Sequence, residues 1–332
     1  MVEARFGPRP APGFIHVLAL AAAFIAPPAA VAQSYPGRPV RLIVSLAPGG
    51  GTDFVARVLA GKLSEAWSQQ VVVDNRPGAG SIVGAEIVAK AAHDGYTLLM
   101  GTNSLLTQPS LFKNLPYNVT RDFAPVTLAL RAPLLLSAHP SLAASNLKEL
   151  IALAQARPGE LTYASPALAT TGHLGGELFK QIARVNILHV PYKGAGSAIS
   201  NLLAGEISLM YSSPPAVIMH IRAGKLKALG VTGSKRAAQA PDIPTFDESG
   251  LTGVEAYDWY GILTPAGTPK PIIHALNAQT VRILQMPDVS DRFASTQFAE
   301  PVGSTPDELQ RFMRSEIERW ARVIRQANIR AE

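Results

Sequence analysis

The chain contains no cysteine and few charged residues for its length. Without cysteine among its 332 residues, it can form no disulfide, thiolate metal site, cysteine nucleophile or lipid attachment through an N-terminal cysteine. Only 16% of the residues are charged, whereas 47% are hydrophobic. A chain of this composition should fold into a compact structure that its core alone stabilises, and its length predicts two domains rather than one.

Catalytic and cofactor motifs are also missing. The sequence has neither the H-E-x-x-H pattern of a zinc enzyme nor the G-x-S-x-G pattern of a serine hydrolase. The third glycine of residues 78–84 comes one position too late for a dinucleotide fingerprint, and residues 47–53 lack the lysine of a phosphate-binding loop. His173 and Glu177 are four residues apart, but no third metal ligand is evident nearby. We therefore predict that the protein is not an enzyme and uses no metal or cofactor.

The formal net charge of +6 is spread over the chain. The densest basic cluster has no aromatic residues between its members, which are Arg222, Lys225, Lys227, Lys235 and Arg236. A nucleic-acid-binding face should concentrate its positive charge, so we expect no nucleic-acid partner. A dispersed positive charge instead favours a weak, long-range attraction for anionic ligands.

The N-terminus has the pattern of a secretory signal. Arg5 and Arg9 precede an apolar stretch over residues 14–26, and the sequence Ala30-Val31-Ala32 follows as a cleavage site. The apolar stretch is shorter than the roughly 20 residues that a membrane-spanning helix needs. We therefore predict a signal peptide over residues 1–32, and a mature protein that is released into the periplasm of a bacterium.

Four segments change from a strand-like run through a turn of small residues into a helical pattern. They are residues 42–53 (LIVSLAPGGGTD), 71–84 (VVVDNRPGAGSIVG), 161–173 (LTYASPALATTGH) and 187–197 (ILHVPYKGAGS). The first amides of a helix have no partner within it and lie at the positive end of the helix dipole, so they can bind an anion. Four such turns predict a protein that holds a small anion.

Strands and helices alternate from residue 40 onward, which predicts an α/β fold with parallel sheets. Two longer apolar runs, residues 126–137 and 257–264, are candidates for strands that cross between domains. Two crossings imply a discontinuous first lobe of residues 33–129 with 257–332, and a second lobe of residues 130–256. The last helix should begin in a capping box at Thr305-Pro306-Asp307-Glu308.

Several segments together resemble one family of transport proteins. APGGGTD, DNRPGAGSIVGAEIVAKAAHDGYTLL, DFAPVTL, GHLGGELF, HVPYKGAGSAISNLLAGEI and YGILTPAGTPKPII occur in order along the mature chain. They resemble the Bug-type extracytoplasmic solute receptors, the substrate-binding components of tripartite tricarboxylate transporters. The resemblance implies a two-lobed periplasmic binding protein of type II, with the two crossing strands as its hinge. It also implies a monomer that binds a small organic carboxylate and works with membrane-embedded transporter subunits, which can be encoded elsewhere.

The same resemblance implies which residues bind the ligand. In the first lobe, two glycine-containing loops would hold a carboxylate through backbone amides and ordered waters. The residues implied there are Leu46, Gly50, Gly51, Thr52, Asp53, Gly80, Ser81, Thr102, Asn103 and Ser104. The second lobe would set selectivity through Ser165, Ala169, Thr170, Thr171, His173, Tyr192, Lys193 and Ser212.

This sequence departs from the family pattern at positions that bear on the ligand. Leu46 stands where an aromatic residue is common, and Ser81 where glycine is common. The apolar segment 166–168 replaces a polar stretch, and Ser212 with Ser213 replaces a common Asp-Asn pair. These changes predict a less negative second lobe, and a ligand with one firmly held carboxylate and a less polar remainder, rather than citrate.

Three alternatives have different requirements. A receptor of this type can serve a sensor kinase instead of a transporter. A periplasmic enzyme would need a nucleophile with a base, or a metal, and neither constellation is visible in the sequence. The ligand domain of a transcription regulator would carry a DNA-binding domain at its N-terminus, where this chain has the predicted signal peptide.

Overall fold

The computed structural model describes residues 1–4, 7, 35–192 and 194–330. The predicted signal peptide therefore lies almost wholly outside the described residues, as does Lys193, and both remain predictions. No helix in the described part of the chain combines the length and apolar character that a membrane crossing needs.

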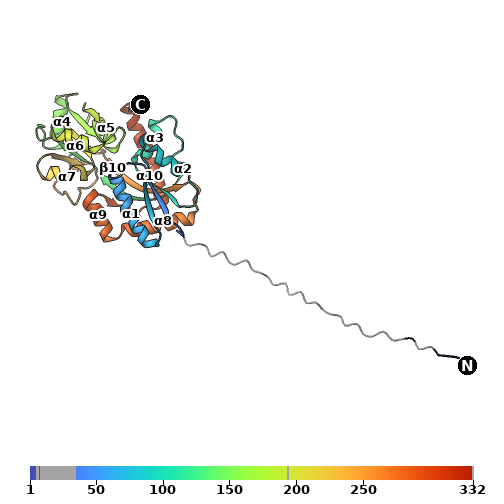
Figure 1. The fold of residues 1–332 in the computed structure, drawn as a ribbon. Coiled ribbons are helices and arrows are strands. Elements are labelled where there is room, and N and C mark those ends of the chain that lie inside the picture. The colour runs from blue at the N-terminus through green and yellow to red at the C-terminus, as the bar shows by residue number, and fades with distance from the viewer. Residues whose placement is uncertain (5–6, 8–34, 193, 331–332) are drawn as a thin grey trace. The chain divides into compact units, whose positions relative to one another are not determined.

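The fold of residues 35–330 is built on two β-sheets, which we call sheet A and sheet B (Figure 1). Sheet A has the order β11-β4-β10-β3-β1-β2 and sheet B the order β7-β6-β8-β5-β9. The strands of sheet A are β1 (Val40–Val44), β2 (Val71–Asn75), β3 (Thr97–Gly101), β4 (Phe123–Pro133), β10 (Tyr257–Pro265) and β11 (Glu300–Pro301). Those of sheet B are β5 (Leu135–Ala138), β6 (Thr162–Ser165), β7 (Leu188–Pro191), β8 (Leu209–Ser212) and β9 (Lys227–Val231).

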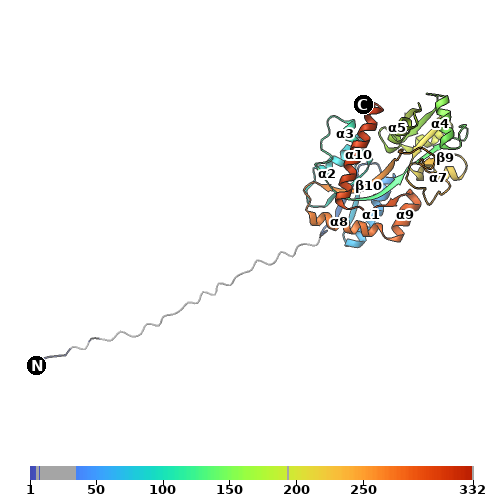
Figure 2. The ribbon, with the colours of Figure 1, turned by 180° about the vertical axis from the view of Figure 1, so that it is seen from behind.

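Helices cover both sheets. Those around sheet A are α1 (Gly51–Trp67), the short helix η1 (Ala79–Ser81), α2 (Ile82–Ala89), α3 (Asn103–Leu111), α8 (Lys270–Leu284), α9 (Pro287–Gln297) and α10 (Pro306–Gln326). Those around sheet B are α4 (Leu147–Ala156), α5 (Thr171–Ala183), α6 (Ala195–Leu203) and α7 (Pro214–Arg222). The same grouping is visible from behind (Figure 2). The prediction of a two-lobed α/β fold is confirmed, with one lobe around each sheet.

Both sheets are mixed, which corrects the expectation of parallel sheets. Strands β1, β2 and β3 pair in parallel, but β10 runs antiparallel to both β3 and β4. In sheet B, β5 runs antiparallel to β8 and β9. The predicted long strand over residues 126–137 is two strands, because β4 ends at Pro133 in sheet A and β5 begins at Leu135 in sheet B. Only Leu134 separates them, and it is buried.

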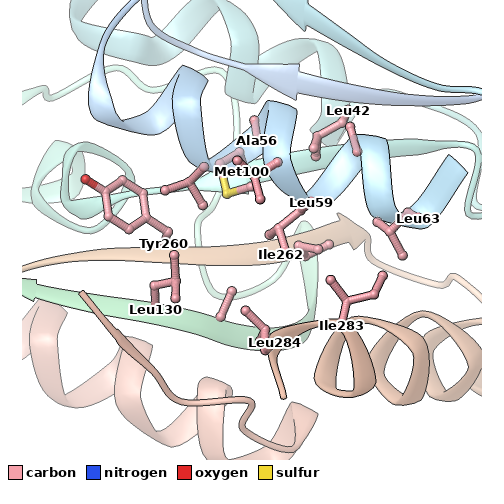
Figure 3. Packing of buried hydrophobic residues seen from close by; sticks show 14 of the residues in the cluster. Leu42, Ala56, Leu59, Leu63, Met100, Leu130, Tyr260, Ile262, Ile283 and Leu284 are labelled. Atoms are coloured by element: carbon pink, nitrogen blue, oxygen red, sulfur yellow. The ribbon is translucent and has the colours of Figure 1, made fainter. Parts of the chain in front are cut away.

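Two apolar cores lie on either side of sheet A. On one side, α1, α8 and α9 pack on the sheet, and Figure 3 shows Leu59 of α1, Ile262 of β10 and Ile283 of α8 in this core. On the other side the core is formed with α2, α3 and the first half of α10. Alternate residues of a strand point to opposite faces, which explains why Leu42 faces one core and Ile43 the other.

Helix α10 contributes to the cores of both lobes. Leu309 and Met313, near its start, pack against sheet A. Trp320, Val323 and Ile324, near its end, pack with α4 and α5 against sheet B. The final helix therefore joins the two lobes through its side chains, in addition to the strands that pass between them.

The capping box predicted for this helix is present. Thr305 Oγ1 accepts a hydrogen bond from the Glu308 amide at 3.3 Å, and Glu308 Oε2 accepts one from the Thr305 amide at 2.8 Å. We expect Thr305→Ala to lower the free energy of unfolding by about 1 kcal/mol, because the Glu308 amide in the first turn loses its hydroxyl acceptor. Thr305→Ser keeps the hydroxyl and is the matched control in urea unfolding. Equal stability of the two variants would contradict the role of this cap.

Candidate functional site

A cleft of about 240 Å³ is lined by residues of both lobes. Sheet A and its connections supply Leu46, Gly51, Thr52, Thr102, Asn103, Ser104, Asp258, Trp259 and Tyr260. Sheet B and its connections, with Leu134 between β4 and β5, supply the others, which are Leu134, Pro166, Thr170, Thr171, Gly172, Tyr211, Ser212 and Ser213. Because both lobes contribute walls, a ligand held here would contact both.

Four helices begin at this cleft. Residues in the first turns or N-caps of α1, α3, α5 and α7 line it. The N-cap residues of the last three are Thr102, Thr170 and Ser213, whose side chains commonly cap helices, yet none accepts a hydrogen bond from its helix. Away from the cleft, Asn146 caps α4 and Thr305 caps α10 with their side chains, whereas α6, α8 and α9 begin at residues without a capping side chain. The first-turn amides of α1, α3 and α5 are thus free of side-chain caps, whereas α7 begins with Pro214 and Pro215 and adds only the positive end of its dipole.

Glycine permits the close approaches that form these walls. A Cβ atom at Gly172 would lie 2.7 Å from the backbone oxygen of Tyr211, so only glycine lets α5 begin this close to β8. A Cβ atom at Gly51 would lie 3.0 Å from the hydroxyl of Tyr260. The first turns of α1 and α5 are therefore packed directly on the strands that carry the cleft's aromatic residues.

Four buried polar atoms of the cleft have no hydrogen-bond partner within the described residues. They are Asn103 Oδ1, Tyr211 Oη, Ser212 Oγ and Trp259 Nε1, and each belongs to a lining residue. All four residues are no more than 4% exposed. Buried polar groups are nearly always paired, and an unpaired one costs about 1–3 kcal/mol. Such a concentration at one cleft indicates a place built for a polar ligand.

The cleft carries little formal charge of its own. Among the described residues that line it there is no lysine, arginine or histidine, and the one ionisable carboxyl is that of Asp258. Burial raises the pKa of Asp258 above its ordinary value of 3.8, and a hydrogen bond from the Thr171 side chain opposes this shift. An anion bound here would rely on backbone amides and hydroxyl groups rather than on basic side chains.

A second cavity of about 540 Å³ adjoins the cleft and shares Leu46, Ser104 and Thr170 with it. Its walls include the turn around η1, and the side chains of Leu111, Phe112 and Leu168. Leu168 is 42% exposed although it is a large apolar residue. The second cavity thus offers an apolar continuation of the cleft.

Most predicted ligand-binding residues line one of these two spaces. Those in the cleft are Leu46, Gly51, Thr52, Thr102, Asn103, Ser104, Thr170, Thr171 and Ser212. Gly80, Ser81 and Ala169 line the second cavity instead. Gly50, Asp53, Ser165, His173 and Tyr192 are not among the described residues that line either space.

Asp53 stabilises the glycine loop through hydrogen bonds and does not line the cleft. It is buried, and its Oδ2 accepts hydrogen bonds from the Gly49 amide at 3.0 Å and from Arg57 Nε at 2.9 Å. Burial alone would raise the pKa of Asp53, but the hydrogen bonds from Arg57 and Gly49 outweigh it and leave the pKa lowered. Asp53 therefore stays ionised and fixes the turn that leads into α1.

His173 and Ser165 support the turn before α5 in a similar way. His173 Nδ1 accepts a hydrogen bond from the Ala169 amide at 2.9 Å, where Ala169 has a φ of 56°. Its ring stacks on His189, with centroids 3.7 Å apart, and Ser165 Oγ lies 2.8 Å from His189 Nε2. Burial lowers the pKa of His173 to about 4 and that of His189 to about 3. Both rings are neutral near pH 7, as this packing requires.

Several lining residues were not predicted. Tyr211 lies in β8, and Asp258, Trp259 and Tyr260 lie in β10. Three of these look like ordinary core aromatics in the sequence. Asp258 is the exception, since a carboxylate inside the apolar run of a crossing strand is unusual and could have marked the site. Asp258 places a negative charge on a crossing strand of the first lobe, so the expectation of a less negative second-lobe wall is not affected by it.

Comparison with known proteins decides the family. The sequence pattern described as the tripartite tricarboxylate transporter family receptor matches residues 55–329. The chain belongs to this family. It is 42% identical over 309 residues to the protein BugT of Bordetella pertussis, covering 92% of this chain and 94% of that one. The predicted Bug-type resemblance is confirmed.

Solved structures agree with this assignment. An R. palustris protein solved with adipate is 37% identical to this chain and superimposes with a TM-score of 0.80. The match covers 90% of this chain and 100% of the R. palustris chain. MatC from Rhodopseudomonas palustris, with bound malate, is 32% identical with a TM-score of 0.75, over 87% of this chain and 100% of that one. The family and these neighbours are substrate-binding receptors of the periplasmic type, not enzymes.

The uncompensated carboxyl of Asp258 should weaken the ligand-free fold. Because burial raises its pKa, ionisation costs stability at neutral pH, and this cost vanishes below the unfolded-state pKa, where both states are protonated. We expect Asp258→Asn to raise the melting temperature of the ligand-free protein by a few degrees at pH 7. The gain should shrink as the pH falls toward 3.8.

The control for this measurement is Asp291→Asn, which changes an exposed aspartate of α9. We expect the melting temperature of this variant to follow that of the unmodified protein at every pH. A pH-independent difference between Asp258→Asn and the unmodified protein would contradict the electrostatic explanation.

Proposed function

We propose that the protein is an extracytoplasmic solute receptor that binds a small organic carboxylate in the cleft between its lobes. The observation that carries this proposal is the convergence of three helix N-termini with uncapped amides, those of α1, α3 and α5, on a cleft without basic side chains among its described lining residues. Free amides at positive helix ends are suited to a carboxylate. The adipate and malate in the two neighbouring structures support the same ligand class.

The expected contacts are strong enough for micromolar binding. A hydrogen bond to a charged group contributes about 1.5–3 kcal/mol, and a partly buried helix N-terminus adds up to about 2 kcal/mol. Five or six such contacts offset an association cost of about 4–15 kcal/mol and leave the roughly 8 kcal/mol of a micromolar complex. The binding requires no covalent chemistry.

The second cavity supports a ligand with a less polar remainder. Leu111, Phe112 and Leu168 line that cavity, and Leu46 and Ser104 line both it and the cleft. A carboxylate at the helix ends can thus extend an aliphatic or aromatic portion past Leu46. Citrate would place a further carboxylate against these apolar side chains at a cost in desolvation.

We also propose how binding is used. The two lobes close on the ligand about β4 and β10, because a ligand that contacts both lobes stabilises the closed form. The first lobe comprises residues 33–129 with 257–332, and the second lobe residues 130–256. The closed, periplasmic monomer then delivers its ligand to a tripartite tricarboxylate-type membrane transporter. A sensor kinase is the alternative recipient of the same closed form.

The ligand class can be tested directly. Purified protein is denatured to release any bound ligand for mass spectrometry, refolded, and screened by thermal shift and calorimetry against adipate, malate, benzoate, hexanoate, 6-aminohexanoate and citrate. We expect stabilisation by acids with one free carboxylate end and an apolar or extended remainder. A ligand at 100 times its Kd should add about 2.7 kcal/mol. Tight binding of citrate with no response to the other acids would contradict the proposed selectivity, and no binding of any acid would contradict the function.

Ser212 provides a test of the cleft itself. Its buried hydroxyl has no partner among the described residues, so Ser212→Ala should leave the ligand-free melting temperature unchanged or higher. The affinity for the best carboxylate should fall roughly tenfold, because one charge-assisted hydrogen bond is lost. Ser137→Ala is the matched control, since Ser137 is equally buried but its hydroxyl donates to the Met210 backbone oxygen away from the cleft. Equal loss of affinity in both variants would contradict this placement.

Leu168 tests the second cavity. We expect Leu168→Asn to weaken binding of acids with a long apolar portion at least about threefold, while short acids such as malate keep their affinity, because only the long ones reach this side chain. Leu188→Asn is the control, since Leu188 of β7 is 50% exposed and does not line either space. Calorimetry with adipate and malate measures both effects, and a parallel loss for both acids would argue against an extended site.

A further inference from the structure

Asp258 stands apart from the other polar groups of the cleft. It is the one carboxyl among the described lining residues, and none of the ion pairs within the described residues involves it. The one group that favours its charged form is the neutral side chain of Thr171, which lowers its pKa. A carboxyl that carries a charge in an otherwise anion-binding cleft needs a further reason, since it repels the carboxylate that the helix ends attract.

The hydrogen bonds around Thr171 fix the direction of each donor. Asn103 Nδ2 donates to Thr171 Oγ1 at 2.6 Å and to the Tyr257 backbone oxygen at 2.9 Å. A backbone oxygen can only accept, so the amide nitrogen of Asn103 must face it. Since Thr171 Oγ1 accepts from Asn103, its own proton is free to be donated to Asp258.

This arrangement leaves two acceptors toward the same part of the cleft. With the Asn103 nitrogen committed, its Oδ1 is the buried atom that has no partner in the described chain. Asp258 supplies carboxyl oxygens beyond the one hydrogen bond from Thr171. Both residues lie next to Thr171. Asn103 Oδ1 has no donor within the described residues, and the half-buried Asp258 forms no ion pair there.

Elsewhere in the cleft, the unpartnered groups are hydrogen-bond donors instead of acceptors. Tyr211 Oη, Ser212 Oγ and Trp259 Nε1 are able to donate and are unpartnered. The first turn of α1 adds free amides, whereas α7 begins with Pro214 and Pro215, which have no N–H to donate. The cleft thus has a donor side, suited to a carboxylate, and an acceptor side at Asp258 and Asn103 Oδ1.

We propose that Asp258 is a specificity-determining residue that, with Asn103 Oδ1, binds a protonated amine carried by the bound carboxylate. The inference rests on the proposed carboxylate-receptor function and names its ligand class as an amino acid, in the sense of any acid with an amine. An ammonium group has three donors and a positive charge, so it satisfies both acceptors and neutralises Asp258. A second carboxylate at the same place would be repelled by Asp258.

The test compares acids that differ in one group. One set is L-phenylalanine, 3-phenylpropanoate and benzylmalonate, in which the amine is replaced by hydrogen or by a carboxylate. The other is 6-aminohexanoate, hexanoate and adipate, in which the terminal aminomethyl group is replaced by a methyl group or by a carboxylate. Calorimetry at pH 7 on the unmodified protein should show the amine-bearing acid binding at least about tenfold tighter than both partners in one set.

Two variants test whether Asp258 causes the preference for the amine-bearing acid. Asp258→Asn should remove the tenfold preference and improve binding of the matching diacid, whereas Asp291→Asn should keep the unmodified order of affinities. If Asp258→Asn does not fold, the comparison of acids on the unmodified protein still decides the question.

The possible outcomes separate the two proposals. Equal or tighter binding of the amine-free acids or the diacids in both sets overturns the role of Asp258 and leaves the carboxylate receptor standing. An amine preference that survives Asp258→Asn also overturns that role. If none of the six acids binds, and malate and benzoate do not bind either, the proposed function fails together with the inference.

Discussion

The requirement that helix amides find acceptors organises this protein around its cleft. Four helices begin there without side-chain caps, although Thr102, Thr170 and Ser213 could provide them. In an ordinary helix, those residues would satisfy the first turn and remove its attraction for anions. Here the strands bring these helix starts to a common space, where the first-turn amides of α1, α3 and α5 have no side-chain cap.

Capture and selectivity therefore depend on different parts of the chain. Backbone amides recognise a carboxylate whatever it is attached to, because they are the same in every sequence. The side chains around them decide what else fits: Asp258 adds a negative charge on one side, and Leu168 adds apolar surface on another. A receptor family can thus keep one binding principle and change its ligands by altering a few positions in strands and loops.

The sequence could not predict which strand-turn-helix junctions form the cleft, because this depends on the order of the strands in each sheet. The four strand-turn-helix junctions were predictable because their signals are local: small residues, then a helical pattern. Only the junctions after β1 and β6 line the cleft, and β2 and β7, which precede the other two, are the edge strands of their sheets. The junctions after β3 and β8 take their places next to β1 and β6. Strand order depends on contacts between distant segments, so local patterns could not assign it, and the aromatic residues of β10 gave no sign of their position.

Helix α10 has a further consequence for the molecule as a whole. Its first half belongs to a core of sheet A and its second half to a core of sheet B. Removing the helix from either lobe would expose Trp320 or Leu309 and their neighbours to water, which costs about 25 cal/mol for each Å² of apolar surface. The two lobes should therefore melt together in one cooperative transition, even though each has its own sheet and its own set of helices.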